Sequence, residues 1–270
     1  MKRSRQTGTV ALAMALMAGA VFGQAAKVTG TIIRTNTTEA KGDLQWKTRE
    51  KAYTVTANNI TVEIPFADVA EVNVPRPKVL DDLEKLVREK NASQAVAGLE
   101  KLVADYLMLT WDRPATRLLA TAYLQMDDVD KAIRVCENII KVDPDSAYLG
   151  EFAPVYWQAL QKKGNNSKVE DLMAKAIKSG DRLASAFALI MRGDMILATG
   201  DTSDNAKKAL RDGYLRVVAL YNSVGERAAR PEALYKAAKC FEKSGQLQRA
   251  ESFRTELKKD FAGTEWAVKP

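Results

Sequence analysis

The sequence has 270 residues, a formal net charge of +7 and 46% hydrophobic residues. This length accommodates one large domain or two modest ones, and the composition is that of an ordinary globular protein. The chain contains no histidine, which removes the commonest general base and most zinc sites. Basic residues alternate with acidic ones and form no dense basic stripe, so nucleic-acid binding is not expected.

The N-terminus has the pattern of a secretory signal peptide. A basic stretch is followed by a short apolar run, residues 10–22, and then by Gly23. We expect residues 1–23 to be removed, with cleavage after Gly23 or Ala25; an uncleaved N-terminal anchor is the alternative. The apolar run is too short for a comfortable membrane span, and no cysteine near either site offers a lipid anchor. The mature chain has no transmembrane candidate and is expected to be exported.

Residues 24–74 alternate apolar and polar side chains, which predicts half-buried β-strands. Asn58 and Asn59 lie between two such runs, where a tight hairpin needs residues that tolerate positive φ. Four or five short strands predict a small all-β module, SH3-like or Sm-like. Such a module either docks or oligomerises, or it caps the open end of a helical array. The sequence leaves both roles open.

A proline linker, residues 75–77, separates this module from a helical region, residues 78–270. Apolar residues there recur at helical spacing and turn residues interrupt them, which predicts about five helix pairs over residues 78–262. The third pair fits a common repeat register only loosely. Gly213 lies inside a helix of the fourth pair, at a cost of about 1 kcal/mol relative to Ala. It indicates either close packing or a local kink.

The best-formed helix pair covers residues 115–144. Small and large apolar residues form one stripe on each helix, a polar corner separates them, and Pro144 ends the second helix. The side chains at the characteristic positions are Thr116, Leu119, Ala120, Tyr123, Ala132, Cys136 and Pro144.

This spacing resembles the tetratricopeptide repeat, and Leu234, Ala237, Ala238 and Phe241 match its first helix again. Thr116, Ala120 and Cys136 depart from the usual Trp, Gly and Phe, and an ordinary two-helix piece of a bundle is the alternative. The whole chain resembles secreted or periplasmic bacterial tetratricopeptide-repeat proteins. Its later part is broadly similar to the helical domains of outer-membrane assembly and Tol–Pal-associated factors. This resemblance implies an α-solenoid that binds other proteins.

In such a solenoid the first helices line a concave groove, and residues opposite the packing stripe face into it. Ordinary solvated surface positions are the alternative for each of them. The candidate groove residues are Arg117, Thr121 and Gln125 in the second pair, and Tyr235, Lys239 and Glu242 in the last.

No catalytic, cofactor-binding or metal-binding set emerges from the sequence. Cys136 and Cys240 fall on inward helical positions more than one repeat apart, so we expect two buried thiols and no disulfide. The tripeptide at residues 203–205 matches one β-lactamase motif, but the companion motifs are missing. The chain is therefore not expected to be an enzyme; a cell-wall enzyme with a repeat domain is the least favoured reading.

Taken together, these patterns predict an exported, non-enzymatic scaffold that binds protein or peptide partners in a bacterial periplasm. The alternative is a structural or assembly subunit of an outer-membrane or envelope complex, which docks or oligomerises through the β module. The sequence does not identify the partner.

Overall fold

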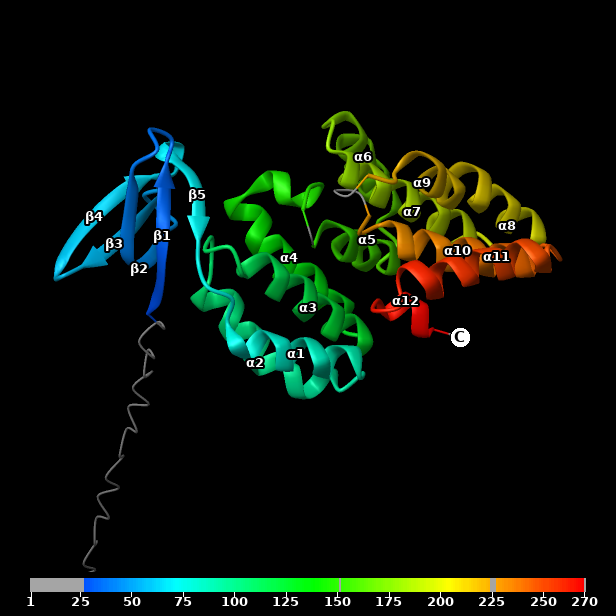
Figure 1. Cartoon of the computed structure of the whole chain (residues 1–270), viewed down its shortest axis with the longest axis horizontal. Coiled ribbons are helices and arrows are strands. Elements are labelled where there is room, and N and C mark those ends of the chain that lie inside the picture. Colours follow the sequence, from blue (N-terminus) through cyan, green and yellow to red (C-terminus); the bar gives the residue numbers. More distant parts are fainter. Residues whose placement is uncertain (1–26, 151, 224–226, 270) are drawn as a thin grey trace, which may run out of the picture.

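The computed structural model describes residues 27–150, 152–223 and 227–269. An antiparallel sheet is followed by packed helices that form the rest of the molecule (Figure 1). The predicted signal peptide, residues 1–23, lies outside the described residues. Within the part of the chain that the structure describes, no helix is long and apolar enough to cross a bilayer.

The N-terminal module is a five-stranded antiparallel sheet with the strand order β4-β3-β2-β1-β5. Asn58 and Asn59 have φ values of 50° and 62° and connect β3 to β4, as expected for a tight hairpin. In the described chain the pairing ends at β4 and β5, which are therefore the two edges. The strands are β1 (Val28–Arg34), β2 (Glu39–Lys47), β3 (Ala52–Ala57), β4 (Ile60–Pro65) and β5 (Val69–Asn73), with the turn η1 (Phe66–Asp68) before β5.

The helices form the five expected pairs, and a short α12 follows them. In the fourth pair the second helix is divided into α8, a π-helical segment η3, and α9. The bounds are α1 (Lys78–Arg88), α2 (Ala92–Asp105), α3 (Asp112–Gln125), α4 (Val129–Val142), η2 (Pro144–Ala147), α5 (Ala153–Lys162), α6 (Asn166–Lys178), α7 (Arg182–Ala198), α8 (Ser203–Ala209), η3 (Leu210–Tyr214), α9 (Leu215–Leu220), α10 (Arg230–Lys243), α11 (Leu247–Asp260) and α12 (Glu265–Val268).

Helix α7 joins two hydrophobic cores. Ala184, Ala188 and Met191 pack into the core formed by α1 to α6, whereas Leu189 and Ile190 pack into the core formed by α8 to α11. Because one helix is buried on both sides, the two halves of the array form one continuous structure.

The loop between α2 and α3, residues 106–111, inserts into the core of the sheet. Met108 and Leu109 are 6% and 1% exposed and pack among the inward side chains of the strands. The buried Tyr53 hydroxyl donates a hydrogen bond to the Met108 carbonyl oxygen at 2.8 Å. We call residues 106–111 the interdomain loop, because it fixes the sheet to the helices by buried contacts in addition to the covalent linker.

The same loop also covers the β5 edge. Thr110 Oγ1 donates to the Val72 carbonyl at 2.7 Å, and Trp111 Nε1 donates to the Val74 carbonyl at 2.8 Å. The Arg76 guanidinium lies over the Trp111 ring, 5.2 Å from its centroid. Backbone acceptors at this edge are therefore satisfied from the helical side.

A buried carboxylate holds the interdomain loop in shape. Asp112, 0% exposed, accepts a 2.7 Å hydrogen bond from the Met108 backbone N–H and pairs with Arg113 at 3.1 Å. Arg113 also reaches Asp143 at 2.7 Å. Burial raises the pKa of Asp112, although Arg113 and two backbone N–H donors oppose the shift. These contacts tie the loop to the start of α3, at Asp112, and to the end of α4, at Asp143.

Gly213 lies at a close contact between helices. Close packing was one of the two interpretations of its position in the sequence, and a local kink was the other. A Cβ atom there would lie 2.8 Å from the Leu189 carbonyl oxygen and 2.9 Å from Gly193 Cα. Gly213 also lies within the π-helical segment η3. The backbones of α7 and η3 therefore approach each other through two glycines, where any side chain would clash.

Changing Tyr53 to Phe tests the interdomain contact. We expect a loss of about 1–3 kcal/mol in the free energy of unfolding, because the buried Met108 carbonyl loses its donor. Tyr148→Phe is the matched control, since the Tyr148 hydroxyl bonds Asp145 at the surface; its effect should stay within about 0.5 kcal/mol. Urea unfolding measures both, and equal effects would contradict the proposed anchoring role.

Gly213→Ala tests the glycine contact. Alanine favours helix by about 1 kcal/mol, yet we expect a net destabilisation of about 1–3 kcal/mol from overpacking. Thermal unfolding measures the change against Gly263→Ala, where an added Cβ has no atom within 4 Å. If Gly213→Ala proved more stable than the unchanged chain, α7 and η3 would have separated at no cost in the free energy of unfolding, which would contradict the close contact.

Candidate partner-binding groove

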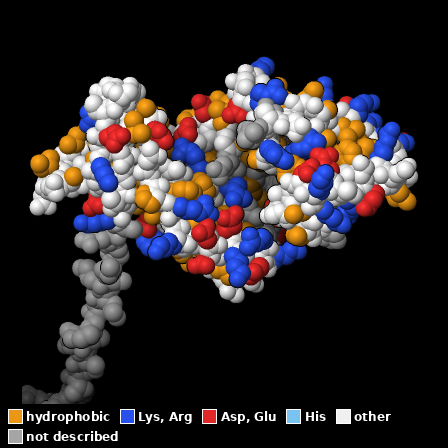
Figure 2. All heavy atoms as spheres, viewed as in Figure 1, with side chains coloured by type: hydrophobic (Ala, Val, Ile, Leu, Met, Phe, Trp, Pro, Cys, Tyr) orange, Lys and Arg blue, Asp and Glu red, His pale blue; other side chains and the backbone are white. Residues whose placement is uncertain are grey.

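The first helices of successive pairs form a shared inner surface. Helix α1 contacts α3, α3 contacts α5, and α5 contacts α7. Figure 2 shows a hollow in the middle of the helical region, with charged side chains of both signs around it. The first helices therefore provide a continuous surface that is accessible to another molecule.

A cavity of about 370 Å³ lies where α3, α5 and α7 meet on this surface. We call it the inner groove. Most residues that line it are polar and uncharged, with one apolar residue and two charged ones, but the surface that they expose to the cavity is mainly apolar. The residues that line it are Thr121, Leu124, Gln125, Gln158, Gln161, Lys162 and Asp194.

Three glutamine side chains give the inner groove its chemistry. A carboxamide has both donors and an acceptor, as a peptide backbone does, although Gln125 already donates through Nε2 to the Val87 carbonyl. Gln125 and Gln161 come from the ends of α3 and α5, and Gln158 is half-buried one turn before the latter. Such a surface can hydrogen-bond an extended segment through its main chain, while Leu124 contacts an apolar side chain.

A second cavity of about 490 Å³ continues from the inner groove between α6 and α7. Gln161 lines both cavities. Arg192 and Met195 form part of its α7 wall.

The candidate residues on α3 lie at the inner surface. Thr121 and Gln125 line the inner groove. Gln125 Nε2 also donates to the Val87 carbonyl at 3.0 Å, and Thr121 Oγ1 donates to the Arg117 carbonyl at 2.8 Å. Arg117 lies 3.7 Å from the Glu84 carboxylate of α1. All three residues lie on α3, and Arg117 and Gln125 contact α1.

The candidate residues on α10 lie apart from that cluster, and none of them is among the residues that line the inner groove. The Tyr235 ring packs on Trp266 of α12, with centroids 5.6 Å apart. Glu242 is 2.7 Å from Arg254 Nε of α11, so it braces its own helix pair. Lys239 is exposed. Thr121 and Gln125 thus line the inner groove, whereas the three candidates on α10 have other surroundings, and a partner-binding role stays a prediction for all of the candidates.

A charged cluster between α7 and α10 did not emerge from the sequence. Asp194 accepts the Tyr214 hydroxyl at 2.7 Å and lies 2.6 Å from Lys236 Nζ, which is also 2.6 Å from Glu232. Burial opposes protonation of Lys236, but the two carboxylates together raise its pKa. The i,i+4 spacing of Glu232 and Lys236 is a visible signal, whereas the contact with α7 is not.

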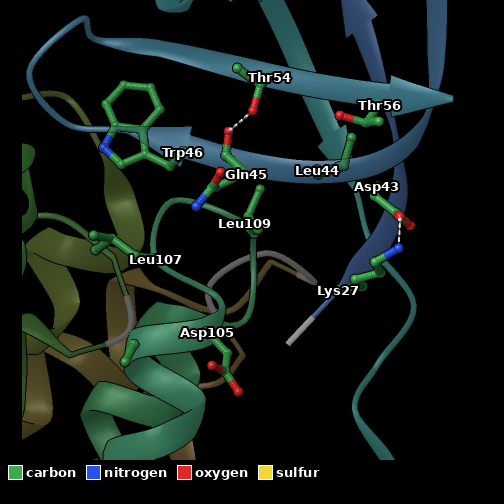
Figure 3. A pocket seen from close by; sticks show the side chains of 11 residues that line it. Lys27, Asp43, Leu44, Gln45, Trp46, Thr54, Thr56, Asp105, Leu107 and Leu109 are labelled. Atoms are coloured by element: carbon green, nitrogen blue, oxygen red, sulfur yellow. Dashed lines mark hydrogen bonds and ion pairs between the residues drawn. The ribbon is translucent and has the colours of Figure 1, made fainter. Parts of the chain in front are cut away.

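Another cavity, of about 470 Å³, lies between the sheet and the end of α2. Figure 3 shows Gln45 and Thr54 on neighbouring strands, with Leu109 and Asp105 from the helical side. Thr54 Oγ1 donates to the Gln45 carbonyl at 3.4 Å. The walls of this cavity therefore come from both the sheet and the helical part.

The two cysteines are buried free thiols, as expected. Burial raises the pKa of Cys240 to about 11 and that of Cys136 further, so neither is a reactive thiolate. Within the described ranges, no group of three or more His, Cys, Asp or Glu residues is placed to hold a metal ion.

Comparison with known proteins identifies the repeats. A family profile described as "Tetratricopeptide repeat" matches residues 118–146 and 232–264. No protein of curated function matches the chain.

Two solved structures are similar to this chain, both of a Podospora anserina putative kinesin light chain with nearly identical TPR-like repeats. The first is 17% identical, with a TM-score of 0.38, and the match covers 70% of this chain and 97% of the other. The second, a Q17M form, is 18% identical, with a TM-score of 0.34, and covers 69% and 96%. The profile match carries the conclusion that this chain contains tetratricopeptide repeats, at α3–α4 and α10–α11, within a helical array that follows a five-stranded sheet.

Proposed function

We propose that this chain is an exported, non-enzymatic scaffold that binds a protein or peptide partner in the inner groove. The observation that carries the proposal is the set of three glutamines on the first helices of adjacent pairs. Tetratricopeptide arrays present such inner surfaces to other proteins. A shallow surface that carries amide groups suits an extended segment better than a small molecule, because small-molecule sites are more enclosed.

Export and an envelope setting rest on the leader pattern at residues 1–23. The resemblance to periplasmic tetratricopeptide-repeat proteins supports a bacterial envelope as the place of action. The alternative function is a structural or assembly subunit of an envelope complex that docks through the sheet. The free β4 edge favours it, since an unpaired strand can accept a strand from another chain.

Gln158→Arg tests the inner groove. A photo-crosslinking residue at position 158 in intact cells first identifies the partner. The affinity for that purified partner should then fall by at least about tenfold, or ~1.4 kcal/mol, in Gln158→Arg, because a long charged side chain fills the groove. Isothermal titration calorimetry measures the change.

Gln248→Arg is the matched control, since Gln248 is exposed on α11 away from the inner groove. Its affinity should equal that of the unchanged chain. Equal capture from positions 158 and 248, or an unchanged affinity in Gln158→Arg, would contradict the groove as the binding site.

Export is tested by N-terminal sequencing of the chain from a Gram-negative-type host. The mature protein should begin at Gln24 or Ala26 and should leave the cells with the periplasmic fraction. Leu16→Arg places a charge in the apolar run and should retain the full-length chain in the cytoplasm. A chain that begins at Met1 in every fraction would refute the proposal of a cleaved leader.

A further inference from the structure

The two edges of the sheet differ in their environment. The β5 edge is covered, because Thr110 and Trp111 of the interdomain loop bond the Val72 and Val74 carbonyls. Among the residues that the structure describes, β4 has a hydrogen-bonded neighbour on one side only, which is β3. Figure 1 shows β4 at the end of the sheet far from the later helices. One edge is therefore available for a further strand.

The register shows which backbone groups face outward. The β3–β4 turn has two residues, so Ala57 and Ile60 form the first hydrogen-bonded pair. Phe66 N–H donates to the Lys51 carbonyl at 2.9 Å, which continues the same alternation. Even-numbered residues of β4 thus bond β3, while Thr61 and Glu63 direct N–H and C=O groups outward.

Apolar side chains of β4 and of the turn η1 are exposed beside that edge. Ile60 and Val62 of β4 and Phe66 of η1 are 68%, 43% and 50% exposed. The Phe66 ring packs 5.8 Å from Trp46, so this apolar surface is continuous with the core face of the sheet. Figure 2 shows hydrophobic side chains at the tip of the sheet, in keeping with these exposures.

The β4 edge is only lightly protected against pairing with another strand. It carries no lysine and no bulge, and its protecting residues are Glu63 and the terminal Pro65, which has no N–H group to direct outward. The register with β3 is unbroken from Ile60 to Pro65.

We propose that β4 pairs antiparallel with β4 of a second copy of this chain, with the two-fold axis at Val62. Thr61 then lies opposite the second copy's Glu63, and both exchange N–H···O=C bonds. Val62 meets the second copy's Val62, and Ile60 meets its Ile64, all on the apolar face. The pairing joins two five-stranded sheets into one.

A second copy fits this edge for two physical reasons. A two-fold pair is self-complementary, so each copy contributes the same apolar residues to the contact. This register also keeps the two Glu63 carboxylates from lying directly opposite each other, which would be repulsive. Pairing of β4 with the second copy's β5 would have to displace the interdomain loop, which bonds the Val72 carbonyl of β5 and the Val74 carbonyl just beyond it.

One strand pair is a small interface, at the low end of the range below about 1,200 Å² that is typical of weak complexes. We therefore expect a concentration-dependent dimer. This inference concerns the sheet and does not rest on the inner groove, so either one can fail alone.

Val62→Cys tests the register in the full exported chain. The non-hydrogen-bonded pair at the axis brings the two Cβ atoms close enough for a disulfide. With oxidised glutathione as the electron acceptor, the chain should shift from one chain mass to two on a non-reducing gel. Cys136 and Cys240 are buried and do not compete.

Leu247→Cys is the matched control, since Leu247 is 67% exposed on α11. It should remain at one chain mass under the same conditions. Equal crosslinking of both variants, or none of Val62→Cys, would overturn the proposed pairing.

Sedimentation equilibrium tests the contact without crosslinking. The chain should form a dimer that increases with concentration, and Ile60→Lys should abolish it, whereas Leu247→Lys should not. A monomer at every concentration would overturn the proposal, as would a dimer that persists in Ile60→Lys. Binding of an extended partner peptide at β4 by a strictly monomeric chain would identify a different occupant and overturn it equally.

Discussion

The insertion of the interdomain loop into the sheet is the contact on which the rest of the architecture depends. Met108 and Leu109 complete a core that the five strands alone do not fill, since a small sheet needs a partner for its apolar face. Met108 and Thr110 adopt φ values of 60° and 74°, which are uncommon for residues other than Gly. Asp112 holds that backbone shape through the Met108 N–H. Uncommon backbone angles, buried apolar side chains and a buried carboxylate thus occur together at the interdomain loop and the start of α3.

This contact also decides which surfaces remain open. The loop that fills the core satisfies the β5 edge, and β4 at the opposite side keeps its outward backbone groups. On the helical side, the Asp194–Lys236 ion pair holds α7 against α10. Lys236 thereby neutralises the carboxylate of Asp194, which lines the inner groove. An unpaired Asp194 carboxylate would attract cations to the inner groove. Because Lys236 pairs with it, the glutamines are the main polar groups of the inner groove. Buried pairing therefore sets the chemistry of the exposed surfaces.

Local pattern in the sequence was sufficient for the elements but not for their non-local contacts. Alternation predicted the strands, Asn58 and Asn59 the hairpin, and the 3.6-residue period the helix pairs, because each depends on neighbouring residues. Residues 106–111 look like an apolar end of α2, and only the folded sheet explains their burial. The repeat register predicted that Thr121 and Gln125 lie on the inner surface, and their partner-binding role stays a prediction. Gln158 and Gln161 were missed because the third pair has a loose register, and Tyr235 is covered by Trp266.

The positions of the two proposed binding surfaces have a consequence for binding strength. The inner groove is formed by α3, α5 and α7, whereas β4 lies at the far side of the sheet, and the interdomain loop separates them (Figure 1). Pairing through β4 therefore leaves both grooves open and fixes their separation through one continuous sheet. A partner with two copies of the recognised segment would then bind both grooves, with an avidity that exceeds the affinity of one groove by roughly 10²–10⁴-fold where the geometry allows it. A weak groove and a weak strand pair would reinforce each other, since each binding event raises the local concentration for the other.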